Sequence, residues 1–296
     1  MGGDTKIEWA EHTFNPWEGC QKVGPGCDNC YAEARDIRFT GGTHWGPGAP
    51  RRRTSAANWA KPLKWNRDAA KTGTRPRVFC ASLADVFDNA VDPAWRADLW
   101  ALIWSTPHLD WLLLTKRPGN IAAMIPQGVD WGAGWVNVWL GCTVVNQAEA
   151  DRDIPKLLAV PAHRRFLSIE PMLGPIDLTN LDPHGDFRPY GAHGWSAIWR
   201  GNGIGRACLD WVVCGGESGP NARPMHPDWA RSLRDQCRTA GVAFHFKQWG
   251  EWEADEIGPE DARSTQFPPG HVIFRKIGKA ATGRKLDGRT WDEVPS

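Results

Sequence analysis

The stretch "VNVWLGCTVVNQAEADRDIPKLLAVPAHRRFLSIEP", residues 136–171, decides the fold. Its two ends, residues 136–144 and 164–171, are short and nearly continuous apolar runs of the kind found in buried strands. The segment between them, residues 146–160, has the character of a helix, so the stretch predicts strand, helix, strand. Because the runs are continuous and do not alternate with polar residues, they favour a parallel sheet that is covered on both faces.

The same pattern repeats along the chain. Further apolar runs lie at 77–82, 109–117, 209–218 and 242–250, and further helix-like segments at 92–105 and 226–241. Alternation of strands and helices predicts βα units, and their number is too large for most mononucleotide-type sheets. We therefore predict an α/β protein with a partial TIM-type barrel, (β/α)6-like, and keep a doubly wound open sheet as the alternative.

Two segments and the tail do not fit the repeat. Residues 40–76 and 175–208 are rich in glycine and in loop-forming residues and are predicted to be insertions in the barrel. We expect one barrel domain over residues 1–250 and a C-terminal extension, residues 251–296, packed on it. Such insertions often carry specificity.

Composition places the chain among ordinary globular proteins. Its 296 residues are 41% hydrophobic and 23% charged. No run of about 18 apolar residues is present, and the N-terminus lacks a basic start followed by an apolar core. We expect no membrane association and a cytoplasmic protein. In a reducing compartment the eight cysteines indicate metal binding or packing more than disulfides.

The basic charge is concentrated in one segment. Residues 34–77 hold eleven lysines and arginines against two aspartates, a net charge of +9, interleaved with tryptophans. Cations beside aromatic rings suit phosphates and stacked bases. The predicted nucleic-acid contacts are Arg51, Arg52, Arg53, Trp59, Lys61 and Lys64. The alternative is a solvated basic loop with no such function.

Polar residues follow each predicted strand, where the functional groups of βα barrels lie. They are Ser82, Asp85, Lys116, Arg117, Thr143, Asn146, Ser168, Glu170, Glu217 and Lys247. We expect Glu170 to bind a ligand or to pair with a cation across the mouth of the barrel, such as Lys116, Arg117 or Lys247. For each residue alone, a role as a turn former, a cap or a structural ion-pair partner is the alternative. Cys142 and Cys214 end two apolar runs and are either hydrogen-atom donors or small buried hydrophobes.

Three cysteines, Cys20, Cys27 and Cys30, form a C-x6-C-x2-C pattern before the first predicted helix, which Asp28 is placed to cap. Thiolates are favoured at a helix N-terminus by its dipole and its free N–H groups. One interpretation is a zinc site, whose fourth ligand would come from elsewhere, with His12 the nearest candidate. The other is an iron–sulfur cluster that three cysteines hold, leaving one iron open.

A family resemblance extends over nearly the whole chain, from about residue 13 to 295. The strings "FNPWEGCQKVGPGCDNCYAEA", "VFCASLADVFD", "RRFLSIEPMLGPIDL" and "GRKLDGRTWDEVP" resemble the phage-associated three-Cys-motif proteins, a family of uncharacterised function regarded as divergent radical S-adenosylmethionine relatives. The resemblance implies a 4Fe–4S cluster, S-adenosylmethionine, an external electron donor and a three-Cys-motif partner protein. It further implies that a 5′-deoxyadenosyl radical is formed, and we expect it to act on a nucleobase or nucleic acid in modification or lesion repair.

On this interpretation the sites divide into three groups. Cys20, Cys27 and Cys30 hold the cluster; the cofactor contacts are Asn29, Tyr31, Ser82, Asp85, Thr143, Asn146 and Ser168; the catalytic or substrate side has Lys116, Arg117, Cys142, Glu170, Cys214, Glu217 and Lys247.

Two departures from the family pattern affect this assignment. The first cysteine gap is longer than the usual C-x3-C, and Val145 replaces a family glutamate, whose role would pass to Asn146 or Glu170. Two alternative functions remain. One is a zinc-stapled nucleic-acid-binding or phage-defence protein without radical chemistry. The other is a cluster-bearing, photolyase-like repair protein, for which the sequence shows no flavin motif.

Overall fold

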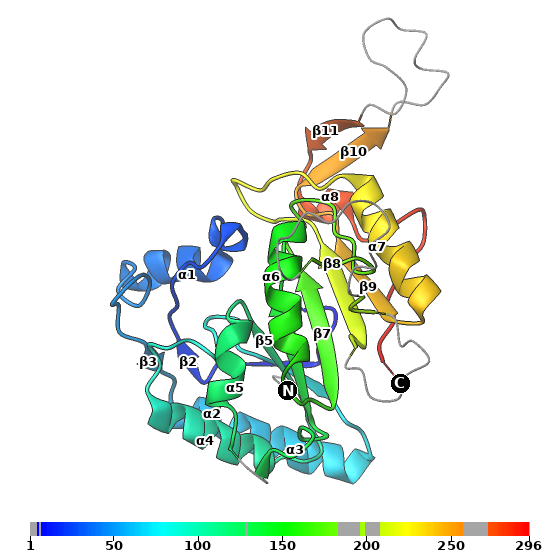
Figure 1. The fold of residues 1–296 in the computed structure, drawn as a ribbon. Helices are drawn as coiled ribbons and strands as arrows, with labels where there is room; N and C mark the ends of the chain where they lie inside the picture. Colours follow the sequence, from blue (N-terminus) through cyan, green and yellow to red (C-terminus); the bar gives the residue numbers. More distant parts are fainter. Residues whose placement is uncertain are drawn as a thin grey trace, which may run out of the picture.

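The fold is organised by a seven-stranded parallel sheet (Figure 1). A computed structural model describes residues 5, 7–127, 130–182, 196–198, 208–256 and 272–295. The strands run in the order β1 (His12–Phe14), β4 (Arg77–Cys80), β5 (Asp110–Thr115), β6 (Val138–Thr143), β7 (Arg164–Ile169), β8 (Trp211–Gly215) and β9 (Ala243–Gln248). Among these residues β1 and β9 are the two edges, so the sheet is a barrel that does not close. The predicted partial barrel is confirmed.

Helices connect successive strands as the sequence predicts. They are α4 (Pro93–Trp104) before β5, α6 (Gln147–Leu158) before β7 and α7 (Pro227–Ala240) before β9. A 3-10 turn (Pro118–Asn120) and the short helix α5 (Ile121–Met124) lie between β5 and β6. The Asp92 and Asn146 side chains accept hydrogen bonds from backbone N–H groups at the starts of α4 and α6, which fixes where these helices begin.

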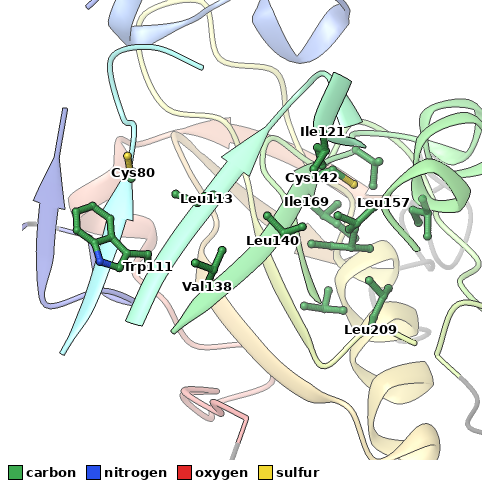
Figure 2. Close-up of a cluster of buried hydrophobic side chains, with 14 of the residues drawn as sticks. Cys80, Trp111, Leu113, Ile121, Val138, Leu140, Cys142, Leu157, Ile169 and Leu209 are labelled. Atoms are coloured by element: carbon green, nitrogen blue, oxygen red, sulfur yellow. The ribbon is translucent and has the colours of Figure 1, made fainter. Parts of the chain in front are cut away.

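Strand order and core packing exclude the doubly wound alternative. That fold reverses its strand order and places helices on both faces, whereas here the strand order follows the chain. The outer face packs against helices, through Leu99 of α4, Ile154 of α6 and Leu233 of α7. The side chains drawn in Figure 2 belong to this outer core. A second cluster, on the inner face, takes its residues from β4 to β8 and from Trp9 and Ala10.

The inner face changes character along the strands. Near the strand starts it is aromatic, and the Trp9 ring lies 4.8 Å from Phe79 and 5.9 Å from Trp211. Residues two apart in a strand face the same side, so the aromatic residues of β6, β7 and β8 are followed on the inner face by smaller or polar residues. Trp139 is followed by Gly141 and Thr143 in β6, Phe166 by Ser168 and Glu170 in and after β7, and Trp211 by Val213 and Gly215 in β8. The interior is therefore filled at the bottom and polar at the C-terminal ends of the strands.

Residues 40–76 contain more regular structure than a loop insertion. They form β3 (Arg52–Arg53), which pairs with β2 (Trp17–Glu18), then α2 (Ala56–Trp59) and α3 (Lys61–Thr72). Trp65 and Ala69 of α3 pack into the outer core, so the second half of this segment is the crossover helix between β1 and β4. The predicted insertion at 175–208 lies mostly outside the described residues.

The C-terminal residues lie against the sheet edge. Beyond the antiparallel pair β10 (Trp252–Glu256) and β11 (Val272–Lys276) and the short helix α8 (Lys279–Thr282), the chain returns to β9. Phe246 N donates to Trp291 O at 2.9 Å, and Glu293 N donates to Phe244 O at 3.3 Å. These bonds satisfy backbone groups of an otherwise open edge.

In the ranges described, no helix is both long enough and apolar enough to cross a bilayer.

Gly216 follows β8 where the chain passes close to the β9 end. A Cβ atom at this position would lie 1.8 Å from the Trp249 carbonyl oxygen. Because that neighbour is backbone, we expect Gly216→Ala to lower the free energy of unfolding by at least about 2 kcal/mol, measured by urea denaturation. Gly119→Ala is the matched control, since its nearest contact would be an ordinary 3.6 Å. Equal stability of the two variants would contradict this packing.

His245 in β9 predicts a pH dependence of stability. It is buried, and its ring nitrogens make no hydrogen bond within the described residues. Burial lowers its pKa from 6.5 to about 4. The unfolded chain therefore binds more protons than the folded chain between these pH values, and stability falls as pH drops from about 6.5 to 4, by about 3 kcal/mol from this group. The His245→Phe variant should lose this part of the decline in urea denaturation series. An unchanged pH profile would show that His245 titrates normally.

Candidate functional site

The cysteine loop leads directly into the first helix. Cys27 ends a 3-10 turn (Pro25–Cys27) and Cys30 is the N-cap residue of α1 (Tyr31–Thr40). All three thiols are free, Cys27 is buried, and Cys20 and Cys30 are partly exposed. The prediction that Asp28 caps α1 is wrong, because the N-cap residue is Cys30 and no side chain caps this helix. The Asp28 carboxylate instead accepts a hydrogen bond from Arg223 Nη1 at 3.0 Å.

Arg117, which follows β5, holds the start of this loop. Its Nη1 lies 3.5 Å from Cys20 Sγ, and its Nη2 donates to Gln21 O at 2.9 Å. Burial raises the pKa of the Cys20 thiol to about 11 and nearby Asp85 adds to the rise, while the Arg117 charge opposes it. Arg117, which was predicted to lie on the substrate side, therefore contacts Cys20, a candidate ligand of the cluster.

Asp85 is occupied by its own protein neighbours. It is 4% exposed and accepts hydrogen bonds from Phe87 N at 2.9 Å, Thr115 Oγ1 at 2.7 Å, Lys116 N at 3.1 Å and Arg117 Nη1 at 3.0 Å. A carboxylate with four donors is part of the frame that orients Arg117. In this structure Asp85 acts on the cysteine loop through Arg117.

Glu217 and Arg223, after β8, clamp the other side of the loop. Arg223 donates to Glu217 at 2.7 Å and to Pro25 O at 2.9 Å, and Asn29 Nδ2 donates to Glu217 Oε2 at 3.0 Å. Burial would raise the pKa of Glu217, but the Arg223 and Asn29 hydrogen bonds outweigh burial and hold the pKa below its usual value. Both predicted residues, Glu217 and Asn29, thus belong to one clamp on the loop.

The loop glycines approach the end of β6 and the start of α6. A Cβ atom on Gly24 would lie 2.5 Å from Glu149 Oε1, and one on Gly26 would lie 2.7 Å from Val145 Cγ1 and 3.5 Å from Lys116 Cε. The loop therefore lies against these three side chains, and a Cβ atom at either glycine would require a neighbouring side chain to shift. Lys116 therefore lies close to the cysteine loop.

Glu149 is a site residue that the sequence interpretation missed. Asn146 caps α6 by accepting from Glu149 N at 3.0 Å, and Glu149 Oε2 accepts from Val145 N at 3.1 Å. Burial raises the pKa of Glu149. The signal was present as Asn146-x-x-Glu149, which resembles a capping box. A carboxylate thus lies beside the loop although Val145 replaces the family glutamate.

On the inner face, Thr143 and Ser168 are register partners and both are buried. Thr143 Oγ1 makes no hydrogen bond within the described part of the chain. Glu170 accepts from Lys247 Nζ at 2.7 Å and from Gln248 Nε2 at 3.2 Å. The expected pairing of Glu170 with a cation is therefore present, and an unpaired hydroxyl lies at the neighbouring strand end.

Ser82 and Tyr31 connect the β4 end to α1. Tyr31 donates to Ser82 O at 2.7 Å, and the Ser82 hydroxyl lies 3.0 Å from Asn15 Nδ2. Asn15 also accepts from Leu83 N at 2.8 Å. Asn15 was not predicted, because a single asparagine after a three-residue strand gives no distinctive pattern.

Cys142 and Cys214 are not brought to this group. Both are fully buried in the outer core, and Figure 2 shows Cys142 close to Ile121 and Ile169. Burial raises the pKa of both thiols. Their surroundings match the small-hydrophobe alternative.

The predicted nucleic-acid residues have several different environments. Arg51 is buried and donates to Asp88 at 2.8 Å, so the structure contradicts a role for it in phosphate contact. Arg52 pairs with Glu18, and Arg53 pairs with Asp98 at 2.6 Å and lies 4.3 Å from the Trp59 ring. The other two, Lys61 and Lys64, are exposed on α3, on the outer side of the sheet.

The donor set suits an iron–sulfur cluster in kind, because three thiols lie on one loop. Across the described ranges, however, no three His, Cys, Asp or Glu side chains are arranged to hold a metal ion. The His12 ring stacks on Trp65 of α3 at 4.3 Å, so the expected fourth zinc ligand has another environment. Two cavities, of 460 and 550 Å³, are lined by residues that include Glu11, Pro76, Asp110 and Arg164. They therefore lie near the strand starts, at the opposite end of the sheet from the cysteine loop.

Residues 4–295 match the model of the family described as "Protein of unknown function (DUF5131)". The chain belongs to the DUF5131 family. No match is found among curated proteins.

Similar solved structures include a variant of spore photoproduct lyase with dinucleoside spore photoproduct. It is 11% identical to this DUF5131 protein, with a TM-score of 0.44, over 93% of this chain and 71% of that chain. A variant of the lyase with bound AdoMet and dinucleoside spore photoproduct is 10% identical, with a TM-score of 0.41, over 86% and 59%.

Proposed function

We propose that this DUF5131 protein is a radical S-adenosylmethionine-type iron–sulfur enzyme that acts on a nucleobase or nucleic acid. One observation carries the proposal: contacts with four strand ends hold a three-thiol loop over the polar end of a partial βα barrel. Tyr31 reaches the β4 end, Arg117 extends from β5, and Glu217 extends from β8. Gly26 lies against Val145, after β6.

Cys20, Cys27 and Cys30 would hold the cluster, and Thr143 and Ser168 would bind S-adenosylmethionine. When bound, these groups would supply one-electron reductive cleavage and the 5′-deoxyadenosyl radical. The chain positions them: Arg117 donates toward Cys20, and the Glu217–Arg223 clamp fixes the other side of the loop. The unpaired Thr143 hydroxyl is available to a polar ligand, since a buried hydroxyl without a partner costs free energy.

Lys116, Glu170 and Lys247 would face the substrate. The nucleic-acid assignment is supported by the excess of basic residues in 34–77, part of which remains exposed. The phage association, a three-Cys-motif partner protein, an external electron donor and a cytoplasmic location remain predictions from the resemblance and the composition.

Anaerobic reconstitution with iron and sulfide tests the proposed function. With dithionite as the electron donor, the protein should release 5′-deoxyadenosine from S-adenosylmethionine, and omission of dithionite should stop the release. An intact cluster that gives no product would leave a structural or redox role and would contradict the proposal. A colourless protein that contains zinc would favour the zinc-stapled alternative.

A further inference from the structure

Helix α1 exposes an unusual amount of apolar surface. Of its ten residues only Ala32 and Asp36 are buried, while Tyr31, Ile37 and Phe39 are 62%, 58% and 68% exposed. In Figure 1 the helix projects to one side of the molecule, apart from the sheet and from α3 and α4. Large apolar side chains grouped on one short helix indicate a contact surface.

The most exposed ring on this helix, that of Phe39, has two guanidinium groups close to it. The Arg35 guanidinium is 5.5 Å from the Phe39 ring centre, and that of Arg38 is 5.4 Å from it. Tyr31, Arg35 and Phe39 are four residues apart, so they form one ridge along the helix. We call Tyr31, Arg35, Arg38 and Phe39 the α1 ridge. It begins beside Cys30 and runs outward from the cysteine loop.

The surroundings of the α1 ridge are positive. Five cations, Lys22, Arg35, Arg38, Arg52 and Arg223, lie on or beside α1 against four carboxylates, Glu18, Asp28, Glu33 and Asp36, of which Asp36 is buried. Glu18 is shared by Arg35 and Arg52, and Arg38 has no ion-pair partner among the described residues. An exposed aromatic ring with adjacent unneutralised arginine suits a stacked base and its phosphates, whereas the cores of protein interfaces are depleted of charge.

We infer that the α1 ridge binds a single-stranded segment of nucleic acid that flanks the nucleotide at the barrel mouth. A base would stack on Phe39, and Arg35 and Arg38 would contact phosphates. This rests on the proposed function and specifies it, because it places the flanking strand on α1 and assigns no contact to Arg51 or to the α3 lysines.

Fluorescence anisotropy with a labelled single-stranded oligodeoxynucleotide tests the α1 ridge. Phe39→Ala should weaken binding about tenfold, since stacking of one base is worth roughly 1–3 kcal/mol. Arg38→Ala should reduce the slope of log affinity against log salt by about one. Trp104→Ala is the matched control: this ring is 67% exposed at the end of α4, away from α1 in Figure 1, and its removal should leave affinity unchanged.

Three results would overturn the inference. If the native protein binds the oligonucleotide and Phe39→Ala binds equally well, the strand lies elsewhere and the proposed function is unaffected. If the native protein binds none, the nucleic-acid part of the proposed function also fails, while 5′-deoxyadenosine release without nucleic acid still reports on the radical chemistry. If Phe39→Ala changes the oligomeric state in light scattering but not the affinity, the α1 ridge is a protein contact.

Discussion

Replacing Cys27 with alanine is expected to abolish iron incorporation and 5′-deoxyadenosine release together. Cys27 is one of three thiols on the loop, and it is the buried one, in the 3-10 turn between the Arg117 and Glu217–Arg223 anchors. Loss of one thiolate leaves two ligands, too few to hold a cluster stably in a short cysteine motif. The measurements are iron and sulfide content after anaerobic reconstitution, and product release with dithionite.

Cys237→Ala is the matched control for this variant. Cys237 is a free, fully buried thiol in α7 that packs in the outer core, so its removal should lower stability modestly and leave the iron content unchanged. Full iron content in Cys27→Ala, or an equal loss in both variants, would contradict the assignment of the loop thiols.

The second large effect is expected from Asp85→Ala. This change removes the acceptor for four donors and leaves the Arg117 guanidinium, whose side chain is 9% exposed, without its nearest carboxylate. Breaking one partner of a buried pair costs about 3–5 kcal/mol, so the free energy of unfolding should fall by that amount. Because Arg117 also positions Cys20, iron content should fall as well.

Asp98→Ala is the matched control for Asp85→Ala, because it removes the carboxylate of an exposed ion pair: Asp98 pairs with Arg53 and is 55% exposed. An exposed ion pair contributes about 1 kcal/mol or less. Asp85→Asn, which keeps two acceptor lone pairs, should lie between the two. Urea denaturation that places Asp85→Ala within about 1 kcal/mol of the native protein would show that this network is not structural.

Much of the barrel follows from local pattern. Six strands and the helices α4, α6 and α7 were predicted because their apolar runs and caps lie within single segments. Strand β1 was missed because three residues are too short to show a pattern. Helix α3 was missed because its buried residues, Pro62, Trp65 and Ala69, are few among basic side chains.

The site was predictable as a place but not as a set of contacts. Arg117 and Glu217, both predicted from their places after strands, contact residues of the cysteine loop. The partners of Glu217, however, include Asn29, 188 positions away in the chain, which no local signal connects to it. Neighbouring residues of a strand face opposite sides of the sheet, so alternation along β6 alone places Thr143 on the inner face and Cys142 on the outer face. Arg51 shows the limit of counting charges, since a buried aspartate, Asp88, neutralises it.

The most direct test of the central claim, that the loop thiols hold an iron–sulfur cluster, is the metal content of protein purified without oxygen. We predict brown protein that contains iron and acid-labile sulfide in equal amounts and that bleaches when dithionite reduces it. Colourless protein that contains zinc and no iron would contradict the claim.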